Sequence, residues 1–329
     1  MDLESAAELS RYLAKKQLIA STDEIAFRLL SGGVSNKVVW IRLPDGREWV
    51  LKQSLRKLRV VSDWFSDPTR ILVEAEGIRY LSGIVKDHVP GLVFVDRDEL
   101  VLAMFAVPEP RLNWKECLLN GAVDLGLVGQ FAELLARIHE AGKAPENAER
   151  FHDRRHFEDL RLAPYYEVAA SKNPGAQSFL EDLIAETRRQ RYTIVHGDFS
   201  PKNIIVHQGR LHLVDHEVIH FGDGAFDVGF ALTHLLGKAN HLKSARMLEA
   251  AEHFWRIYQK KGCPSAAIAQ RALRHGLGCL LARVDGRSPL EYLSEENRTL
   301  QRQSVLDMMA RAPVSVSDLI QRFGRSVHV

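Results

Sequence analysis

Cysteine, long apolar runs and net charge are all scarce in this 329-residue chain. Its three cysteines, Cys117, Cys263 and Cys279, are too few and too widely spaced for a disulfide framework or a zinc ribbon, so we expect reduced and mostly buried thiols. The longest apolar run, residues 100–107, is strand-sized and well short of the roughly 18 residues that a membrane span needs. These absences exclude a disulfide-rich secreted module and an integral membrane protein.

The formal net charge is only +2, with 46% hydrophobic and 26% charged residues, which is typical of a globular enzyme and excludes a disordered chain. We expect neither nucleic acid nor a membrane as partner. Residues 1–18 follow an amphipathic helical pattern without the apolar core of a secretion signal, which favours a cytoplasmic location. Residues 230–329 carry 15 Lys and Arg against 8 Asp and Glu, an excess that disfavours a polycationic ligand there.

Residues 1–106 are predicted to form a small antiparallel sheet with one helix against it. The expected strands are 25–30, 37–43, 48–53, 91–95 and 100–105. Between the third and fourth strands, residues 69–81 have helical spacing. The apolar face of this helix contains Glu74, whereas Arg70 and Glu76 lie largely off it.

The prolines of the segment 107–110 (VPEP) mark a boundary, after which the chain is mainly helical. The expected helices are 118–141, 177–189, 226–236, 242–260 and 266–283. This order predicts an α+β protein with a nucleotide-binding N-terminal lobe over 1–106 and a larger C-terminal helical lobe over 107–329, which holds the acceptor site. Only residues 194–215 revert to short β runs.

Three oxygen-bearing side chains are predicted to converge in that β segment. Two apolar runs around the tetrapeptide HQGR (207–210) predict a hairpin, so Asn203 before it and Asp215 after it emerge at one end, beside the loop that carries Asp198. Oxygen ligands of this kind suit Mg²⁺, and a carboxylate that the metal does not use can deprotonate a hydroxyl. The alternative is that Asp198 and Asn203 form turns and Asp215 caps a turn or helix.

The segment 196–203 (HGDFSPKN), followed by a hairpin ending in Asp-x-Glu, resembles the catalytic loop of the aminoglycoside phosphotransferase and choline kinase-like superfamily. Residues 221–229 (FGDGAFDVG) are similar to that family's Gly-Asp-x-x-x-Asp element, with Gly224 where many relatives have proline. The resemblance covers residues 27–236 and implies a bilobal protein kinase-like fold that uses ATP and Mg²⁺.

The resemblance also implies roles for individual residues. Asp198 would be the catalytic base, and Asn203 and Asp215 would bind magnesium with Glu217 as a further ligand. Asp227 would accept backbone hydrogen bonds from the catalytic loop.

The N-terminal lobe supplies the residues expected to bind the nucleotide. A glycine turn between the first two strands lets backbone N–H groups approach phosphates, and its candidate residues are Ser31, Gly32, Gly33, Ser35 and Asn36. Lys52 lies in the third strand, as the phosphate-pairing lysine of a kinase does, and Glu74 is its expected partner. The adenine is expected against Met104 and Ala106.

These residues predict a kinase that transfers the γ-phosphate of ATP to a hydroxyl of a small molecule. Segments 52–61, 74–76 and 215–217 look most like 5-methylthioribose kinases, but amino alcohols and aminoglycosides also remain open as acceptors. The eleven residues between Asp215 and Asp227 leave no room for the activation segment of a protein kinase. The sequence assigns no oligomeric state.

Two further alternatives belong to other classes of protein. A metal-dependent phosphoesterase is one, because five histidines accompany the motif, namely His196, His207, His212, His216 and His220. A nucleotide-binding pseudokinase is the other.

Overall fold

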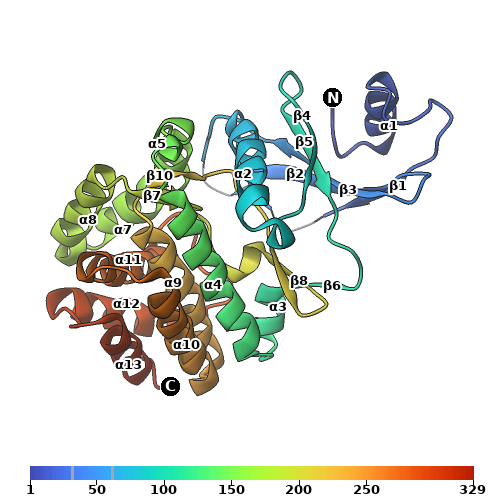
Figure 1. Ribbon diagram of the computed structural model, residues 1–329. Coiled ribbons are helices and arrows are strands. Elements are labelled where there is room, and N and C mark those ends of the chain that lie inside the picture. Colours follow the sequence, from blue (N-terminus) through green and yellow to red (C-terminus); the bar gives the residue numbers. More distant parts are fainter. Residues whose placement is uncertain (31–32, 61–62) are drawn as a thin grey trace. The chain divides into compact units, whose positions relative to one another are not determined.

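A computed structural model describes residues 1–30, 33–60 and 63–329, and the chain divides into two compact units (Figure 1). The first unit is Met1–Glu109 together with Asp215–Glu217, and the second is Pro110–Val214 with Val218–Val329. The chain therefore changes unit after Glu109, and three residues from late in the sequence return to the first unit. None of the helices in the described ranges is long and apolar enough to cross a membrane.

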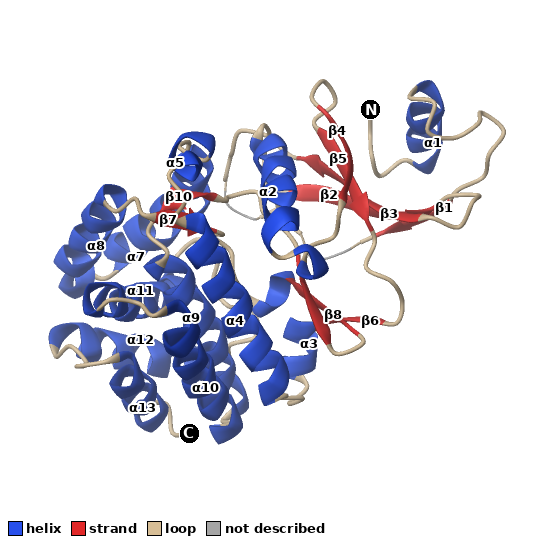
Figure 2. Cartoon of the chain, viewed as in Figure 1, coloured by secondary structure: helices blue, strands red, loops and turns tan. Residues whose placement is uncertain are grey.

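The first unit is built on a five-stranded antiparallel sheet, drawn in red in Figure 2. In spatial order its strands are β1 (Ala26–Leu29), β2 (Asn36–Arg42), β3 (Glu48–Ser54), β5 (Val101–Phe105) and β4 (Leu92–Asp96). The helix α1 (Ala6–Lys15) buries Leu9 and Leu13 in one apolar core with Val39 and Leu51 of the sheet. The predicted meander of strands and the helix before it are both confirmed.

The helix α2 (Arg70–Ile84) corresponds to the helix predicted over 69–81 and contacts β3, β4 and β5. Glu74 lies on its buried face, as helical spacing predicted. The expectation for Arg70 is wrong, because this side chain is fully buried. Its guanidinium is surrounded by carbonyl groups and one carboxylate from other segments of the same unit, which satisfy its donors.

The second unit is mainly helical. Its longer helices are α4 (Leu125–Gly142), α8 (Gln177–Arg189), α9 (Ala225–Leu242), α10 (Ala245–Gly262), α11 (Ala266–Asp285), α12 (Glu295–Ala310) and α13 (Val316–Ser326). Shorter ones are α3 (Trp114–Leu119), α5 (Glu146–Arg150), α6 (Arg155–Phe157), the π-helical η2 (Glu158–Glu167) and α7 (Val168–Lys172). The helices α12 and α13 were not predicted.

The prediction of a single helix over 118–141 is wrong, because this part of the chain contains the end of α3 and most of α4. Gly121 adopts a left-handed conformation with φ of 80°, which ends the first. Asp124 then begins the second by accepting hydrogen bonds from the backbone N–H groups of Gly126 and Leu127.

The predicted hairpin is present as β8 (Ile204–His207) and β9 (Arg210–Leu213), with β6 (Arg111–Asn113) pairing on the other edge of β8. Gln208 and Gly209 at its turn have φ of 48° and 73°, the left-handed pair that a type I′ turn requires. A second antiparallel pair, β7 (Thr193–Val195) and β10 (His220–Gly222), brackets the hairpin in sequence. Residues 196–203 are therefore a connection anchored at both ends.

The three cysteines are free, as predicted, but they are not mostly buried. Only Cys279 is buried, Cys117 is half-buried, and Cys263 is exposed at the end of α10.

The helices α9 and α11 approach each other closely at Gly229. A Cβ atom at this position would lie 2.6 Å from the backbone nitrogen of Gly276 and 2.6 Å from Cβ of His275. Because backbone atoms cannot move aside as a flexible side chain does, only glycine fits there without displacing a helix.

We therefore expect Gly229→Ala to lower the free energy of unfolding by about 1–3 kcal/mol, measured by urea denaturation followed by circular dichroism. The matched control is Gly276→Ala on the facing helix, where the new Cβ would meet only Cδ1 of Leu319, at 3.6 Å. That variant gains helix propensity and is expected to match or exceed the parent in stability. Equal stability of Gly229→Ala and the parent would contradict this packing.

Candidate active site

The loop 196–203 is held at its start by one buried carboxylate. Asp227, at the N-terminus of α9, accepts hydrogen bonds from the backbone N–H groups of His196 at 2.7 Å and Gly197 at 2.8 Å, as predicted. Gly197 has φ of 76°, and a Cβ there would lie 2.8 Å from Cγ2 of Val218. The glycine of the motif is therefore required by backbone conformation and by space.

Asp227 is fully buried, which by itself would raise the pKa of its carboxyl group. His139, whose Nε2 lies 3.3 Å from Oδ2, and the donated N–H of His196 outweigh this effect, so the pKa lies below its ordinary value. Gly224 directly precedes this helix, and a Cβ there would lie 2.8 Å from Cγ2 of Thr193.

The carboxylate of Asp198 is fixed from two sides through one of its oxygens. Oδ2 accepts hydrogen bonds from Nδ2 of Asn203 at 2.7 Å and from Nη2 of Arg161 at 2.9 Å. Arg161 also donates from Nε to the carbonyl of Gly197, at 2.8 Å. Oδ1 of Asp198 takes part in neither contact, so it is the oxygen left for another molecule.

Arg161 was not found from the sequence. It lies in η2, a π-helical segment that contains Pro164, so its phase does not follow the 3.6-residue spacing on which the helix predictions rest. Proline inside an otherwise helical pattern was the one available signal of an irregular helix.

Asn203 and Asp215 mark the open end of the hairpin, as its geometry predicted. Asn203 ends the short 3₁₀ helix η4 (Pro201–Asn203), and its carbonyl accepts a hydrogen bond from the backbone N–H of Val214, at 3.0 Å. Asp215 follows Val214 directly and has φ of 71°. Left-handed backbone is uncommon for a residue other than glycine, and it is one of the forms of strain that gather at functional sites.

Lys52 of β3 joins two carboxylates in the first unit. Its Nζ lies 2.7 Å from Oε1 of Glu74 and 2.6 Å from Oδ1 of Asp215. Burial would lower the pKa of Lys52, but the two carboxylates raise it above its ordinary value, so the ammonium stays charged. The expected contact between Lys52 and Glu74 is therefore present, and Asp215 is a second carboxylate partner of the same ammonium group.

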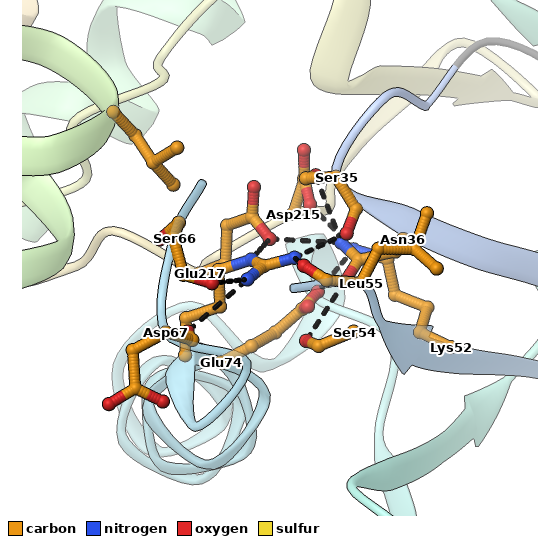
Figure 3. A network of polar contacts seen from close by, with 12 residues as sticks. Ser35, Asn36, Lys52, Ser54, Leu55, Ser66, Asp67, Glu74, Asp215 and Glu217 are labelled. Atoms are coloured by element: carbon orange, nitrogen blue, oxygen red, sulfur yellow. Dashed lines mark hydrogen bonds and ion pairs between the residues drawn. The ribbon is translucent and has the colours of Figure 1, made fainter. Parts of the chain in front are cut away.

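A second buried ion pair ties residues 215–217 to the same unit (Figure 3). Oε2 of Glu217 accepts hydrogen bonds from Nδ2 of Asn36, at 2.9 Å, and from Nε of Arg70, at 3.0 Å. The guanidinium of Arg70 also donates to the carbonyls of Ser35 and Leu55. Arg70 thus links the glycine turn, the end of β3 and residues 215–217, a role that the sequence did not reveal.

Glu74, Asp215 and Glu217 form a group that is able to hold a cation, since one oxygen from each lies within 4.8 Å of the others. Oε2 of Glu74 is buried without a hydrogen-bond partner. The structure thus groups two of the predicted metal ligands with Glu74, whereas the third, Asn203, contacts Asp198 in the second unit.

The other predicted nucleotide-binding residues differ in how far the structure describes them. Ser31 and Gly32 lie outside the described residues. A Cβ on Gly33 would meet nothing closer than 3.8 Å, so the geometry does not require glycine there. Met104 is buried in β5, and Ala106 donates its backbone N–H to the carbonyl of Glu48 at 2.9 Å, so that N–H is not free for an adenine.

We expect Asp227→Asn to lower the free energy of unfolding by about 3 kcal/mol at pH 7, because the NH₂ group of the amide would face one of the two backbone donors and leave it unpaired. The pKa of Asp227 is lowered in the fold, so its contribution is fully present above the ordinary carboxyl pKa and is lost as pH falls through the folded value. In urea titrations, the difference between parent and variant should therefore stay constant from pH 7 down to the ordinary carboxyl pKa of 3.8 and shrink below it.

The matched control is Asp182→Asn, because Asp182 is exposed on α8. This substitution should leave both the stability and its pH dependence unchanged. A difference between the parent and Asp227→Asn that stays constant with pH would contradict the role assigned to Asp227.

Curated relatives and solved structures agree on the fold. The chain is 25% identical over 286 residues to methylthioribose kinase 1 of Oryza sativa subsp. japonica, covering 74% of this chain and 66% of that one. It is 25% identical over 220 residues to methylthioribose kinase of Pectobacterium atrosepticum, covering 57% of this chain and 53% of that one. The chain thus spans less than two thirds of the length of these relatives.

An amicoumacin kinase solved in complex with AMP-PNP has a TM-score of 0.60 at 14% identity, covering 96% of this chain and 98% of that one. A choline kinase from Streptococcus pneumoniae has a TM-score of 0.54 at 15% identity, covering 93% and 98%. These likenesses confirm the predicted kinase-like α+β fold.

A family model described as the phosphotransferase enzyme family matches residues 26–260, the range that contains Lys52, Asp198, Asn203, Asp215 and Asp227. Because this match covers most of the chain, the protein belongs to the phosphotransferase enzyme family.

Proposed function

We propose that this chain is an ATP-dependent kinase that transfers the γ-phosphate to a hydroxyl group of a small molecule. The observation that carries the proposal is the ammonium of Lys52, held within 2.7 Å of both Glu74 and Asp215. A buried lysine positioned by a helix glutamate is the phosphate-pairing device of kinases. Membership of the phosphotransferase family supports the same reading.

The nucleotide would be bound mainly by the first unit. Lys52 would pair with the phosphates, under the turn that contains Ser35 and Asn36 together with Ser31, Gly32 and Gly33. The adenine would lie against Met104 and Ala106, recognised by groups other than the N–H of Ala106, which is already paired.

The donor set fits magnesium. Nδ2 of Asn203 donates to Asp198, which leaves the amide oxygen of Asn203 for a cation, and Asp215 and Glu217 supply carboxylate oxygens. We therefore propose that Asn203, Asp215 and Glu217 hold Mg²⁺. When bound, the ion neutralises phosphate charge.

Asp198 would orient the acceptor hydroxyl and take its proton. Asn203 and Arg161 hold Oδ2, so the carboxylate has one defined orientation and presents Oδ1. Positioning of this kind accounts for much of the acceleration in phosphoryl transfer, since the protein does little covalent chemistry.

The phosphoesterase alternative finds no support in the histidines. Among the described residues, the group able to hold a metal consists of three carboxylates and no histidine. His220 is buried, and burial lowers its pKa to about 4, while His207 contacts the carbonyl of Pro110. Among acceptors, the names of the curated relatives make methylthioribose-like sugars the first class to test.

The test of the proposed function is ADP release in the presence of a panel of hydroxylated metabolites. We expect Asp198→Asn to lower acceptor-dependent turnover by about 10³-fold, because the amide cannot take the proton, while ATP affinity changes little. Asp182→Asn again serves as the exposed control. Near-normal turnover of the Asp198 variant would overturn the assignment. Phosphoester hydrolysis without ATP would favour a phosphoesterase, and ATP binding without turnover would favour a pseudokinase.

A second experiment distinguishes the proposed role of Glu217 as a metal ligand from its structural role. Glu217→Gln keeps an oxygen that can accept from Asn36 and Arg70 but lowers the charge offered to a cation. We expect the Mg²⁺ concentration for half-maximal turnover to rise about tenfold or more. The melting temperature should fall as well, because the buried guanidinium of Arg70 loses its counter-ion. Glu76→Gln, on the same helix as Glu74, is the control. An unchanged Mg²⁺ requirement would assign Glu217 a purely structural role.

A further inference from the structure

Lys238 and Arg283 are two buried cations of the second unit. Lys238 of α9 is fully buried, and its Nζ donates to the carbonyl of His234, at 3.2 Å. Arg283 of α11 is 8% exposed and donates to the hydroxyl of Tyr165, at 3.0 Å, and to Ser288. Within the described part of the chain, neither side chain forms an ion pair.

Such burial is unfavourable, because a cation removed from water needs a compensating charge. Lys238 shows the consequence, since burial, with Lys115 and Arg283 nearby, lowers its pKa to about 7. A group that destabilises the fold in this way is typical of a binding site, where ligand contacts supply what the protein alone does not.

Unpaired polar atoms gather around these cations. Nε2 of His234, Nε of Arg283 and the hydroxyl of Tyr292 are all buried without a hydrogen-bond partner. His234 is 5% exposed, and the ring of Tyr292 lies 5.4 Å from Nζ of Lys238. Because buried polar groups in proteins are nearly always paired, three unpaired ones beside two cations indicate a ligand that accepts hydrogen bonds.

Glu291, a carboxylate whose charge acts on Lys238, already forms an ion pair with Lys115. Asp198 forms one with Arg161. The positive charge of Lys238 and Arg283 is therefore left for something other than the chain itself.

Aromatic rings connect the cluster to the proposed catalytic carboxylate. Arg161, which contacts Asp198, lies over the ring of Tyr165 at 5.7 Å, and Arg283 lies over the same ring at 5.6 Å. Arg161 also lies 6.0 Å from the ring of Phe230, which packs against His234 with centroids 4.8 Å apart. The cluster and Arg161 thus share the ring of Tyr165, which links the cluster to the residue that holds Asp198.

We propose that the phosphate acceptor is an anionic hydroxy compound, whose carboxylate or phosphate group is bound by Lys238 and Arg283 with His234. This rests on the proposed function. The hydroxyl oxygen of the acceptor forms the bond to the γ-phosphorus, the bond to the bridging oxygen of ADP breaks, and the hydroxyl proton passes to Asp198. A neutral sugar such as methylthioribose would leave both cations without a counter-ion, so the chain would differ from its named relatives in acceptor.

The test uses ribose, ribonate and ribose 5-phosphate as matched probes, with ADP release as the readout for the full chain. We expect kcat/KM for at least one anionic probe to exceed that for ribose by about 30-fold or more, because charge-assisted hydrogen bonds form only with the anion. The two anions separate carboxylate from phosphate recognition. Lys238→Met and Arg283→Gln should each abolish most of this preference, whereas Lys260→Met, at an exposed position of α10, should retain it.

Calorimetric binding of ribonate and ribose 5-phosphate without nucleotide gives a readout that does not depend on catalysis. Loss of binding in Lys238→Met, with a melting temperature at or above that of the parent, supports the site, since removing an unpaired buried ammonium should not destabilise the fold. If Lys238→Met loses anion binding but no probe supports ATP turnover by the parent, the anion site is upheld and the kinase function is rejected. Equal turnover of ribose and both anions, or undiminished anion binding by both variants, would overturn the proposal.

Discussion

The first unit depends on one electrostatic requirement, which is that the buried ammonium of Lys52 needs carboxylates around it. Glu74 comes from α2, and Asp215 lies 163 residues after Lys52 in the chain. Residues 215–217 therefore belong to the first unit although their neighbours on both sides belong to the second. Arg70 and Glu217 repeat the arrangement, with the cation on α2 and the carboxylate in the same short segment, so two ion pairs fix residues 215–217.

The second unit satisfies the same requirement around the loop 196–203. The carboxylate of Asp227 is matched by backbone N–H groups, and that of Asp198 by Asn203 and Arg161. In both units each buried charge of the proposed machinery thus has a defined partner, which holds the side chain in one orientation before any ligand binds.

The parts of this site that could be predicted from the sequence are those that local rules determine. Two apolar runs around a glycine-containing turn predict a hairpin with Asn203 and Asp215 at one end, and the structure contains this hairpin. Helical spacing predicts that Glu74 lies on the buried face of α2, where it contacts Lys52. Arg70 could not be found in this way, because the carbonyls of Ser35 and Leu55 that bury it are distant in sequence.

Arg161 escaped prediction for a different reason. A π-helical segment rotates its side chains out of the phase that a 3.6-residue pattern assumes. Ion pairs that join distant segments and irregular helices are the two features that single-sequence reasoning does not capture.

The same reasoning explains why acceptor chemistry is hardest to predict in this fold. The helix α9 is buried along almost its whole length, from Ala225 to Asn240. Its mostly apolar sequence is therefore typical of a core helix, and Lys238 is an exception within it. Local rules are expected to fail where function requires it, and Lys238 breaks the rule that a buried cation is paired. The charges around Lys52 are matched within the chain, whereas Lys238 and Arg283 form no ion pair with the residues that the structure describes. On the proposal made above, these two cations are where specificity for an acceptor is encoded.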